Sequence, residues 1–486
     1  MASIMVQGTS SYSGKSFLVM TLCRIFRDKG VNVAPFKSQN MSLNSYVTRD
    51  GREMARAQAL QAFAAGVEPS VEMNPILVKP TGESRSQIVV NGRPYKDINA
   101  KDYYRDFALK EGLEIARNAF KALERKYDLI IVEGAGSPAE INLYHQDIAN
   151  MRIADMADAP VVLIADIDRG GAFASIYGTL ALLKEEHRDR VRGIVINKFR
   201  GDIGILKPGI KEIEELTKRP VLGTIPYIED LKLPSEDSVS LQDINEPRGN
   251  IKIAVIKLPR ISNFTDFDPL LNDGVNVTYV KEPEELKSAD AIVIPGTKNT
   301  IADLEWLREK GFEESIRTLH GKVPIVGICG GYQILGNSIT DGLKKVRGLG
   351  LLDVETRFEG YDKTTQQARG KVAAAAGMFE GMAGNEVCGY EIHMGRTALG
   401  DSAAPVFKMK DGKDGAVDAD GTVFGTYLHG IFDSSSFREG FLKFLGSNAS
   451  ACSKGQEEIW NESIDRAARA VSNSIDIARI EEELHA

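Results

Sequence analysis

A glycine-rich segment near the start of the sequence has the composition of a phosphate-binding loop. Gly8 and Gly14 enclose five residues and are followed directly by Lys15 and Ser16. The usual pattern has four residues between the glycines. The longer spacer still lets backbone N–H groups and a helix N-terminus surround a polyphosphate, while the lysine reaches its oxygens and the serine meets Mg²⁺. The segment therefore predicts that Gly8, Thr9, Gly14, Lys15 and Ser16 bind a nucleotide, with a plain glycine-rich turn as the alternative.

Two further polar groups follow apolar runs of strand length. Ligands of open α/β sheets gather at the carboxyl ends of the strands. Glu133 leaves the run 129–132 into a glycine turn, so it is the candidate carboxylate for Mg²⁺. Asn197 and Lys198 follow the run 193–196, and we predict that they contact the nucleotide base. A structural role is the alternative for each of these residues.

The second candidate centre is a cysteine between glycines. The apolar run 324–328 leads into Cys329, and Gly330 follows it. Glycines on both sides tolerate the strained backbone of a nucleophile elbow, and a following helix N-terminus favours the thiolate. The N–H groups of Gly330 and of Gly296, which follows another apolar run, are expected to form an oxyanion hole. We therefore predict that Cys329 is a nucleophile, the alternative being a buried cysteine that packs as a small hydrophobic residue.

A histidine is expected to activate this cysteine, and the sequence contains six of them. His429 follows the strand-like run 422–428 and precedes Gly430, which suits a loop at a strand end beside the elbow. We predict His429 as the base, with a hydrogen-bonded core histidine as the alternative. Of the other five, His320 and His485 lie in polar helical stretches, and we interpret His393 as structural.

The elements that must position these groups read as an α/β fold. Apolar runs rich in valine and isoleucine alternate with longer helical stretches, which is typical of parallel strands covered by helices on both faces. A polar stretch with two prolines, 229–250, separates two such series. We predict an N-terminal P-loop domain with a doubly wound parallel sheet and a C-terminal α/β domain. The expected units are 1–228, the linker 229–250, 251–445, and a helical extension 446–486 that carries a docking helix.

The composition limits the number of domains and the classes of partner that this chain can have. Its 486 residues are 43% hydrophobic, enough for two or three globular domains. The net charge of −8 offers no broad attraction to nucleic acid or to an anionic membrane. No apolar run approaches eighteen residues, and no export signal opens the chain. We expect a cytoplasmic protein with a small-molecule substrate, and the sequence leaves open whether it forms a homo-oligomer.

The cysteines show no CxxC pair, which argues against disulfides and zinc; they are Cys23, Cys329, Cys388 and Cys452.

Two family resemblances refine this interpretation. The five-residue spacer, the segment VEGAG at 132–136 and Lys37 resemble dethiobiotin synthetase, which uses ATP to activate a carboxylate. That resemblance implies a second magnesium carboxylate within 50–58, and we favour Glu53 over Asp50. Lys37 is the candidate that neutralises an acyl phosphate.

The C-terminal half resembles the class I glutamine amidotransferases, in which a cysteine releases ammonia from glutamine. The commonest form has a glutamate two residues after the histidine, whereas Ile431 stands here. That departure resembles the subgroup that amidates corrin rings, and it leaves the third member of the catalytic set unassigned.

Nearly the whole chain resembles the adenosylcobyric acid synthases. The segments PFKSQNMSLNSYV at 35–47, MARAQALQAFAAG at 54–66, NPILVKP at 74–80 and GYEIHMG at 389–395 carry this resemblance. It implies four amidations, each consuming one ATP and one glutamine, of the b, d, e and g carboxylates of a corrinoid, adenosylcobyrinic acid a,c-diamide. The residues expected to contact this substrate form a polar run beyond a strand end: Gln39, Asn40, Ser42, Asn44 and Ser45.

Two alternatives remain at this stage. One is the sibling enzyme that amidates the a and c carboxylates of the same ring, against which the segment 35–47 argues. The other, from a different class, is a P-loop switch ATPase of the partitioning type. Those ATPases carry a second lysine early in the loop. The corresponding residues of this chain, 9–11, include no lysine. The order of the amidations, the route of ammonia and the need for the adenosyl ligand stay open.

Overall fold

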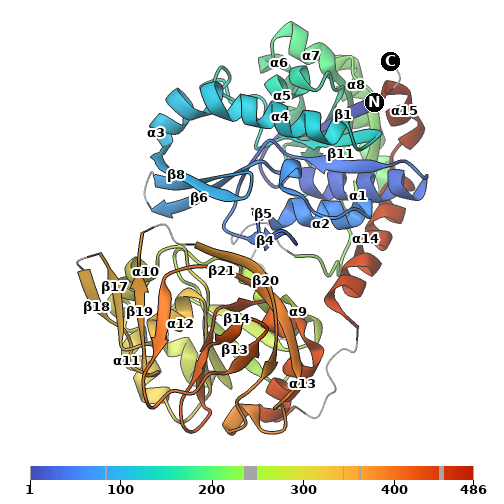
Figure 1. Ribbon diagram of the computed structural model, residues 1–486. Coiled ribbons are helices and arrows are strands. Elements are labelled where there is room, and N and C mark those ends of the chain that lie inside the picture. Colours follow the sequence, from blue (N-terminus) through green and yellow to red (C-terminus); the bar gives the residue numbers. More distant parts are fainter. Residues whose placement is uncertain are drawn as a thin grey trace.

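The computed structural model describes residues 2–82, 85–234, 249–342, 344–360, 363–447 and 454–484. The chain forms two lobes stacked one above the other, with the N-terminal half in one and most of the C-terminal half in the other (Figure 1). The central part of the expected linker, residues 235–248, lies outside the described residues, as do Cys452 and His485.

The N-terminal lobe is built on a six-stranded sheet in which every neighbouring pair is parallel. Its strands are buried on both faces: Ile4 and Val6 of β1 pack against α1, whereas Met5 faces the opposite side. This two-sided burial explains why the strands read as continuous apolar runs and confirms the predicted parallel α/β sheet. In spatial order the strands are β12 (Val221–Pro226), β11 (Val191–Phe199), β10 (Val161–Asp166), β1 (Ala2–Gly8), β9 (Leu129–Glu133) and β2 (Val33–Phe36).

Helices cover both faces of this sheet. The helix predicted after the phosphate-binding loop is α1, which ends at Asp28, two residues before Gly30. The helices of this lobe are α1 (Lys15–Asp28), α2 (Arg56–Ala65), α3 (Ala100–Asp102), α4 (Leu113–Glu124), α5 (Met151–Met156), α6 (Ala172–Leu182), α7 (Glu185–Arg190) and α8 (Ile203–Thr217). A π-helix, Tyr103–Gly112, joins α3 to α4.

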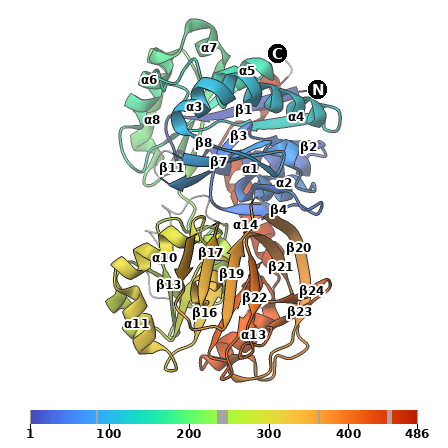
Figure 2. The same ribbon diagram turned by 60° about the vertical axis from the view of Figure 1, so that its left-hand side comes forward.

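An insertion between β2 and α4 extends the N-terminal lobe toward the other lobe. It contains a four-stranded sheet and a two-stranded ribbon, neither of which the apolar runs predicted. The ribbon lies at the boundary between the lobes in both views (Figures 1 and 2). The sheet comprises β3 (Gln39–Met41), β6 (Ile76–Gly82), β7 (Arg85–Val90) and β8 (Arg93–Asn99), and the ribbon β4 (Ser45–Val47) and β5 (Glu53–Ala55).

The C-terminal lobe has its own six-stranded sheet, with one antiparallel edge strand. In spatial order its strands are β14 (Asn276–Val280), β13 (Lys252–Ile256), β15 (Ala291–Ile294), β16 (Ile325–Ile328), β26 (Val423–Thr426) and β25 (Ala416–Val417). The helices around it are α9 (Asp268–Asn272), α10 (Thr300–Glu309), α11 (Phe312–Leu319), α12 (Gly330–Leu335) and α13 (Ser435–Phe444).

Two smaller sheets complete this lobe. One contains β18 (Lys344–Arg347), β17 (Ser338–Asp341), β19 (Val354–Phe358) and β22 (Arg396–Leu399). The other contains β24 (Gly412–Asp414), β23 (Phe407–Met409), β20 (Lys363–Val372), β21 (Glu386–Met394) and β27 (Leu428–His429).

The C-terminal extension returns to the N-terminal lobe instead of packing on the domain that precedes it. Helix α14 (Gln456–Ser472) lies beside α1 (Figure 1). Helix α15 (Ile477–Glu483) follows it on the same lobe, where Glu481 pairs with Lys29 just after α1. Ile464 and Val471 of α14 join the apolar cluster formed by α1 and the sheet. Arg24 of α1, almost fully buried, pairs with Asp465 and donates to the Asn461 side chain at 2.6 Å. The single predicted docking helix is therefore two helices, and both ends of the chain stabilise one lobe.

Candidate active site

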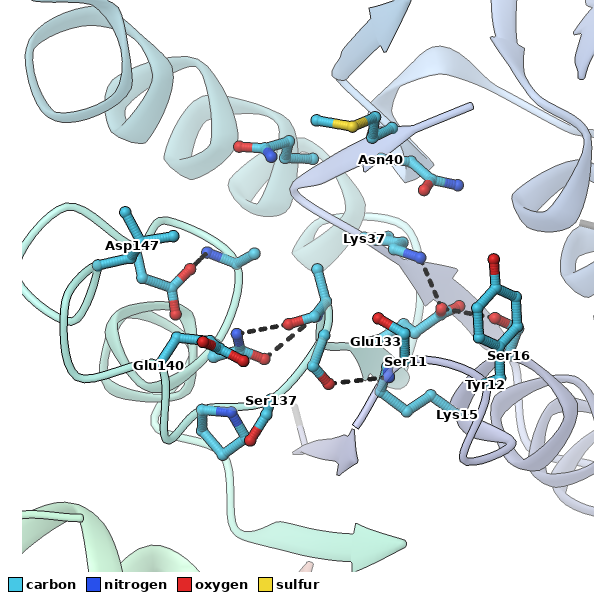
Figure 3. Close-up of a pocket in the computed structure, with 18 of the residues that line it drawn as sticks. Ser11, Tyr12, Lys15, Ser16, Lys37, Asn40, Glu133, Ser137, Glu140 and Asp147 are labelled. Atoms are coloured by element: carbon cyan, nitrogen blue, oxygen red, sulfur yellow. Dashed lines mark hydrogen bonds and ion pairs between the residues drawn. The ribbon is translucent and has the colours of Figure 1, made fainter. Parts of the chain in front are cut away.

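A cavity of about 800 Å³ opens at the carboxyl end of the N-terminal sheet. The phosphate-binding loop and the start of α1 form one side of it, and the segment 135–150 forms another (Figure 3). The predicted site residues that line it are Gly14, Lys15, Ser16, Lys37, Gln39, Asn40, Glu133 and Lys198. These groups are far apart in the sequence, and the fold brings them to one edge of the sheet as parallel topology requires.

The phosphate-binding loop is closely fitted to its surroundings. Gly14 has φ 103°, and a Cβ atom there would lie 2.0 Å from Asn197 Nδ2, so only glycine fits. The Lys15 ammonium donates to the backbone oxygens of Ser10 and Gly136, each at 2.9 Å. These bonds fold the lysine back over the loop, where it is poised to meet phosphate oxygens.

Three predicted nucleotide contacts are not among the described residues that line the cavity: Gly8, Thr9 and Asn197. Asn197 donates from Nδ2 to Ser13 O at 3.0 Å, so it holds the loop backbone. Lys198 does line the cavity, and its ammonium binds Tyr12 O at 2.9 Å and Asp166 at 2.7 Å. Base recognition by this pair therefore stays a prediction, whereas its support of the loop is evident.

Glu133 is the centre of a buried polar network. Its Oε1 accepts hydrogen bonds from Ser16 Oγ and Lys37 Nζ, each at 2.7 Å (Figure 3). Its Oε2 accepts from the side-chain amides of Gln58 at 3.1 Å and Gln61 at 2.5 Å. A hydroxyl and a carboxylate therefore meet at one point of the cavity wall, and hard oxygen ligands of this kind suit Mg²⁺. No group of three or more His, Cys, Asp or Glu side chains with metal-binding geometry occurs among the described residues.

Glu53 lies elsewhere, which corrects the position expected from the sequence. It is 1% exposed at the boundary between the lobes and does not contribute to the cavity wall formed by described residues. Its carboxylate pairs with Lys79 and with Lys363 of the C-terminal lobe and accepts from Ser45 Oγ at 2.8 Å. Burial alone would raise the pKa of Glu53, but the two lysines lower it below its usual range. The disfavoured alternative, Asp50, pairs with Arg52 near the surface.

The predicted substrate run is divided between two places. Gln39 and Asn40 line the cavity, and Asn40 donates from Nδ2 to Gln58 Oε1 at 2.8 Å. The remaining three residues are buried outside the described cavity lining: Ser42, Asn44 and Ser45. Asn44 and Ser45 bind Thr265 and Asn263 of the C-terminal lobe. Segment 39–47 therefore connects the cavity directly to the C-terminal lobe.

Cys329 occupies a strained turn between β16 and α12. Its backbone has φ 53° and ψ −106°, a conformation that side-chain-bearing residues rarely adopt and that functional sites retain. A Cβ atom on Gly331 would lie 1.8 Å from Ile294 O, and one on Gly330 would lie 3.0 Å from Thr297 N. Both glycines are therefore needed where the elbow packs against the loop after β15. The thiol is buried, and its Sγ lies 3.7 Å from Ile392 O.

His429 is fully buried, and its imidazole is close enough to Cys329 for the cysteine to raise the pKa of the histidine. Its Nδ1 lies 2.7 Å from Asp266 Oδ2, and the Gly430 N–H donates to the other oxygen of Asp266 at 3.0 Å. Burial lowers the pKa of His429, but the Asp266 carboxylate and Cys329 outweigh this effect and raise it to about 10. A cysteine, an imidazole and a carboxylate arranged in this order are the components of a nucleophilic triad.

Asp266 is the member of this candidate triad that the sequence did not predict. It lies in a short 3-10 helix, Phe264–Phe267, far in sequence from His429. The available signal was the group of polar residues within 262–268, in the loop that follows the first strand of the C-terminal lobe. Of the two predicted oxyanion donors, Gly330 begins α12, and Gly296 lies beside the imidazole, where a Cβ atom would be 3.0 Å from His429 Cε1. Their role in binding an oxyanion stays a prediction.

Replacing Asp266 with asparagine is expected to lower glutamine hydrolysis about 100-fold, because the imidazolium loses the charge that stabilises it. The pKa of His429 should fall from about 10 toward or below 6.5, and alkylation of Cys329 at pH 7 should slow. A raised folded-state pKa contributes stability that is complete below the unfolded-state value and is lost as pH rises toward 10. Denaturant unfolding at several pH values should show this loss in the unaltered protein and not in Asp266→Asn.

Models of two domain families match the chain. The CobQ/CobB/MinD/ParA nucleotide binding domain matches residues 4–241, and the CobB/CobQ-like glutamine amidotransferase domain matches residues 252–437. A probable cobyric acid synthase of Methanothermobacter thermautotrophicus is 51% identical over 509 aligned positions, with 99% of both chains covered. The chain belongs to the cobyric acid synthase family.

Other members of the cobyric acid synthase family agree with this placement. The protein of Pelotomaculum thermopropionicum is 51% identical and covers 91% of this chain and 87% of its own length. That of Dehalococcoides mccartyi is 50% identical, with 98% and 97% covered. Similarity across both lobes does not favour the switch ATPase considered above. None of the described helices is long and apolar enough to cross a membrane.

Proposed function

We propose that this chain is an ATP-dependent, glutamine-hydrolysing amide synthase of cobalamin biosynthesis. It converts the b, d, e and g carboxylates of adenosylcobyrinic acid a,c-diamide to amides and gives adenosylcobyric acid. The observation that carries the proposal is that one chain holds a Cys329–His429–Asp266 triad in one lobe and a phosphate-loop cavity in the other. Segment 39–47 joins the two through hydrogen bonds to Thr265 and Asn263. We assign the ATP-dependent step to residues 1–228 and the release of ammonia to residues 251–445.

Ammonia is released in the C-terminal lobe. The Cys329 thiolate attacks the side-chain carbonyl carbon of glutamine, and the N–H groups near Gly296 and Gly330 stabilise the oxyanion that forms. As the C–N bond breaks, His429 gives a proton to the departing nitrogen, and a thioester remains. Water then attacks the thioester, yielding glutamate and restoring the thiol. Asp266 keeps the imidazole oriented throughout.

The carboxylate is activated in the N-terminal lobe. A substrate carboxylate oxygen attacks the γ-phosphorus of ATP, so that ADP leaves and an acyl phosphate forms. Lys15 and Lys37 face the charge that builds up on the transferred group. Ser16 and Glu133 would hold Mg²⁺, which neutralises phosphate charge when bound. Ammonia attacks the acyl carbon, phosphate leaves, and one proton is lost as the amide forms.

One short segment of the chain joins the two sites. Asn40 lines the cavity, whereas Asn44 accepts a hydrogen bond from Thr265, the neighbour of Asp266, at 3.1 Å. A fully extended chain spans at most about 14 Å between these positions. We infer that ammonia released beside Cys329 passes along this segment between the packed lobes and meets the acyl phosphate before water competes for it.

The proposal is tested by supplying the protein with ATP, Mg²⁺, amide-¹⁵N-labelled glutamine and adenosylcobyrinic acid a,c-diamide. Chromatography with mass spectrometry should show four successive conversions of carboxylate to labelled amide, together with equal amounts of glutamate and ADP. ATP hydrolysis without amide formation would support a switch ATPase instead. Amidation restricted to the a and c carboxylates of the unamidated ring would indicate the sibling enzyme.

A further inference from the structure

The N-terminal lobe reaches the glutaminase centre through Arg56, a residue that the chemistry above does not use. Arg56 begins α2 and is only 8% exposed. Its Nη2 donates to the Tyr390 hydroxyl of the C-terminal lobe at 2.9 Å, and its backbone N–H donates to Asn44 O at 3.1 Å. Arg56 is thus held between segment 39–47, through its backbone, and strand β21, through its side chain.

Tyr390 carries this contact to the catalytic imidazole. Strands β21 and β27 pair so that Tyr390 lies directly opposite His429. The two rings stack with centroids 5.3 Å apart and planes 16° from parallel, and the Arg56 guanidinium lies 5.4 Å from the tyrosine ring centre. The Tyr390 ring therefore forms one wall of the imidazole site, and its bond to Arg56 fixes the orientation of that wall.

Arg56 also supplies positive charge where the C-terminal lobe gathers acids. Burial raises the pKa of Asp268 to about 8 and that of Asp433 to about 7, while Arg56 acts in the opposite direction on both. Asp266 itself lies within the electrostatic range of Arg56. A buried guanidinium from one lobe thus favours the charged forms of the acids that the other lobe gathers near His429.

A second contact from the same lobe reaches the other side of the imidazole. The Ser45 N–H donates to Asn263 Oδ1 at 2.9 Å, and the Asn263 N–H donates to Leu43 O at 3.3 Å. This arrangement turns Asn263 Nδ2 toward His429 Nε2, at 3.3 Å. The imidazole therefore depends on the N-terminal lobe at its ring face and at Nε2, and on its own lobe at Nδ1.

We propose that Arg56 is a positioning residue for glutamine hydrolysis, which holds Tyr390 against His429 and so makes the Cys329–His429 pair competent only while the lobes are docked. The inference rests on the proposed function and deepens it. An enzyme organised in this way releases ammonia only when the domain that consumes it is in place.

The test compares full-length Arg56→Met, Arg56→Lys, Tyr390→Phe and the Arg56→Met/Tyr390→Phe double variant with the unaltered protein. Each is assayed with glutamine and, separately, with ammonium chloride as the nitrogen source. The matched control is Gln87→Ala, which removes a different bond across the same boundary, from Lys298 Nζ to Gln87 Oε1 at 2.7 Å. Gln87 does not touch the triad, so this control reports the effect of loosening the interface alone.

Arg56→Met is expected to lower the glutamine-dependent kcat about 30-fold, while amidation from ammonia changes less than about two-fold. Tyr390→Phe keeps the stacked ring and should lose about five-fold, and the double variant should be no slower than Arg56→Met, because both changes break one contact. Arg56→Lys, which keeps the charge, should recover part of the rate. Gln87→Ala should behave as the unaltered protein with both nitrogen sources.

Equal losses with glutamine and ammonia, or additive losses in the double variant, would overturn the positioning role. The unaltered protein separates this result from failure of the proposed function. If the proposed function is wrong, the unaltered protein itself forms no amide from glutamine or from ammonia. Alkylation of Cys329 by iodoacetamide needs no corrinoid, so it tests the role of Arg56 even if the protein forms no amide. Arg56→Met should slow the alkylation, and an unchanged rate would overturn the proposal.

Discussion

Cys329→Ala is expected to abolish amidation from glutamine, lowering it at least about 1,000-fold, and to leave amidation from ammonium chloride within about two-fold of the unaltered protein. The thiol sits on an elbow whose backbone is strained and whose neighbours are glycines that nothing larger can replace. Its only use in the proposed chemistry is to form the thioester, so free ammonia bypasses it. Steady-state rates with the two nitrogen sources, measured at saturating ATP and corrinoid, provide the comparison.

Cys388→Ala is the matched control for this prediction. Cys388 lies on strand β21 of the same lobe, is exposed, and contacts Ser434 instead of a histidine. Its replacement should change neither rate. Residual glutamine-dependent activity in Cys329→Ala above the background of free ammonia would contradict the assignment of the nucleophile, and loss of both activities would show that the elbow is required for the ATP-dependent lobe as well.

The parts of the site that sequence could predict are those encoded by local pattern. Gly14, Lys15 and Ser16 follow a strand and open a helix, and Cys329 lies between glycines at a strand-to-helix turn. In both cases the backbone conformation demanded by the chemistry restricts the residues nearby, and the restriction is visible within ten positions. The parallel sheets were predictable for a similar reason, because burial on both faces leaves continuous apolar runs.

The parts that sequence could not predict depend on contacts between distant segments. Asp266 and His429 are separated by 163 positions and meet only when the C-terminal sheet has formed. Glu53 has the residue type of a metal ligand, yet the packing of the two lobes surrounds it with lysines from both. Arg56 lies within a segment used for family resemblance, but its partner Tyr390 is on the other lobe. A single sequence shows which residues are polar and buried; it does not show which element covers them.

The division of the polar run 39–45 illustrates the same limit. All of its predicted substrate contacts follow one strand end, so they read as one surface facing one ligand. The chain instead turns between β3 and β4, which leaves Asn40 at the cavity and buries Ser45 against the C-terminal lobe. Polarity in this run therefore serves two purposes, binding at one end and docking at the other. Docking of this kind is what the proposed coupling through Arg56 requires.

Lys37→Met is expected to abolish amide formation from both glutamine and ammonia, by about 1,000-fold or more, while Cys329 keeps its reactivity toward iodoacetamide. Lys37 is 4% exposed, lines the cavity and donates to Glu133 at 2.7 Å, so its charge lies where the phosphoryl group must be transferred. The effect is therefore the reverse of that for Cys329→Ala: supplying free ammonia does not restore activity, because the acyl phosphate never forms. Positional isotope exchange in ATP, which reports reversible acyl phosphate formation, should disappear as well.

Loss of a buried ion pair can also unfold a protein, since the buried Glu133 charge costs several kcal/mol when its cationic partner is removed. Lys37→Arg separates unfolding from loss of catalysis, because it keeps a positive charge beside Glu133 but places a wider, planar group in the cavity wall. If both variants melt as the unaltered protein does and Lys37→Met alone loses isotope exchange, the charge of Lys37 acts on the transferred phosphoryl group. If Lys37→Met forms amide from ammonia at the normal rate, the cavity is not the site of carboxylate activation, and the division of labour between the lobes must be reassigned.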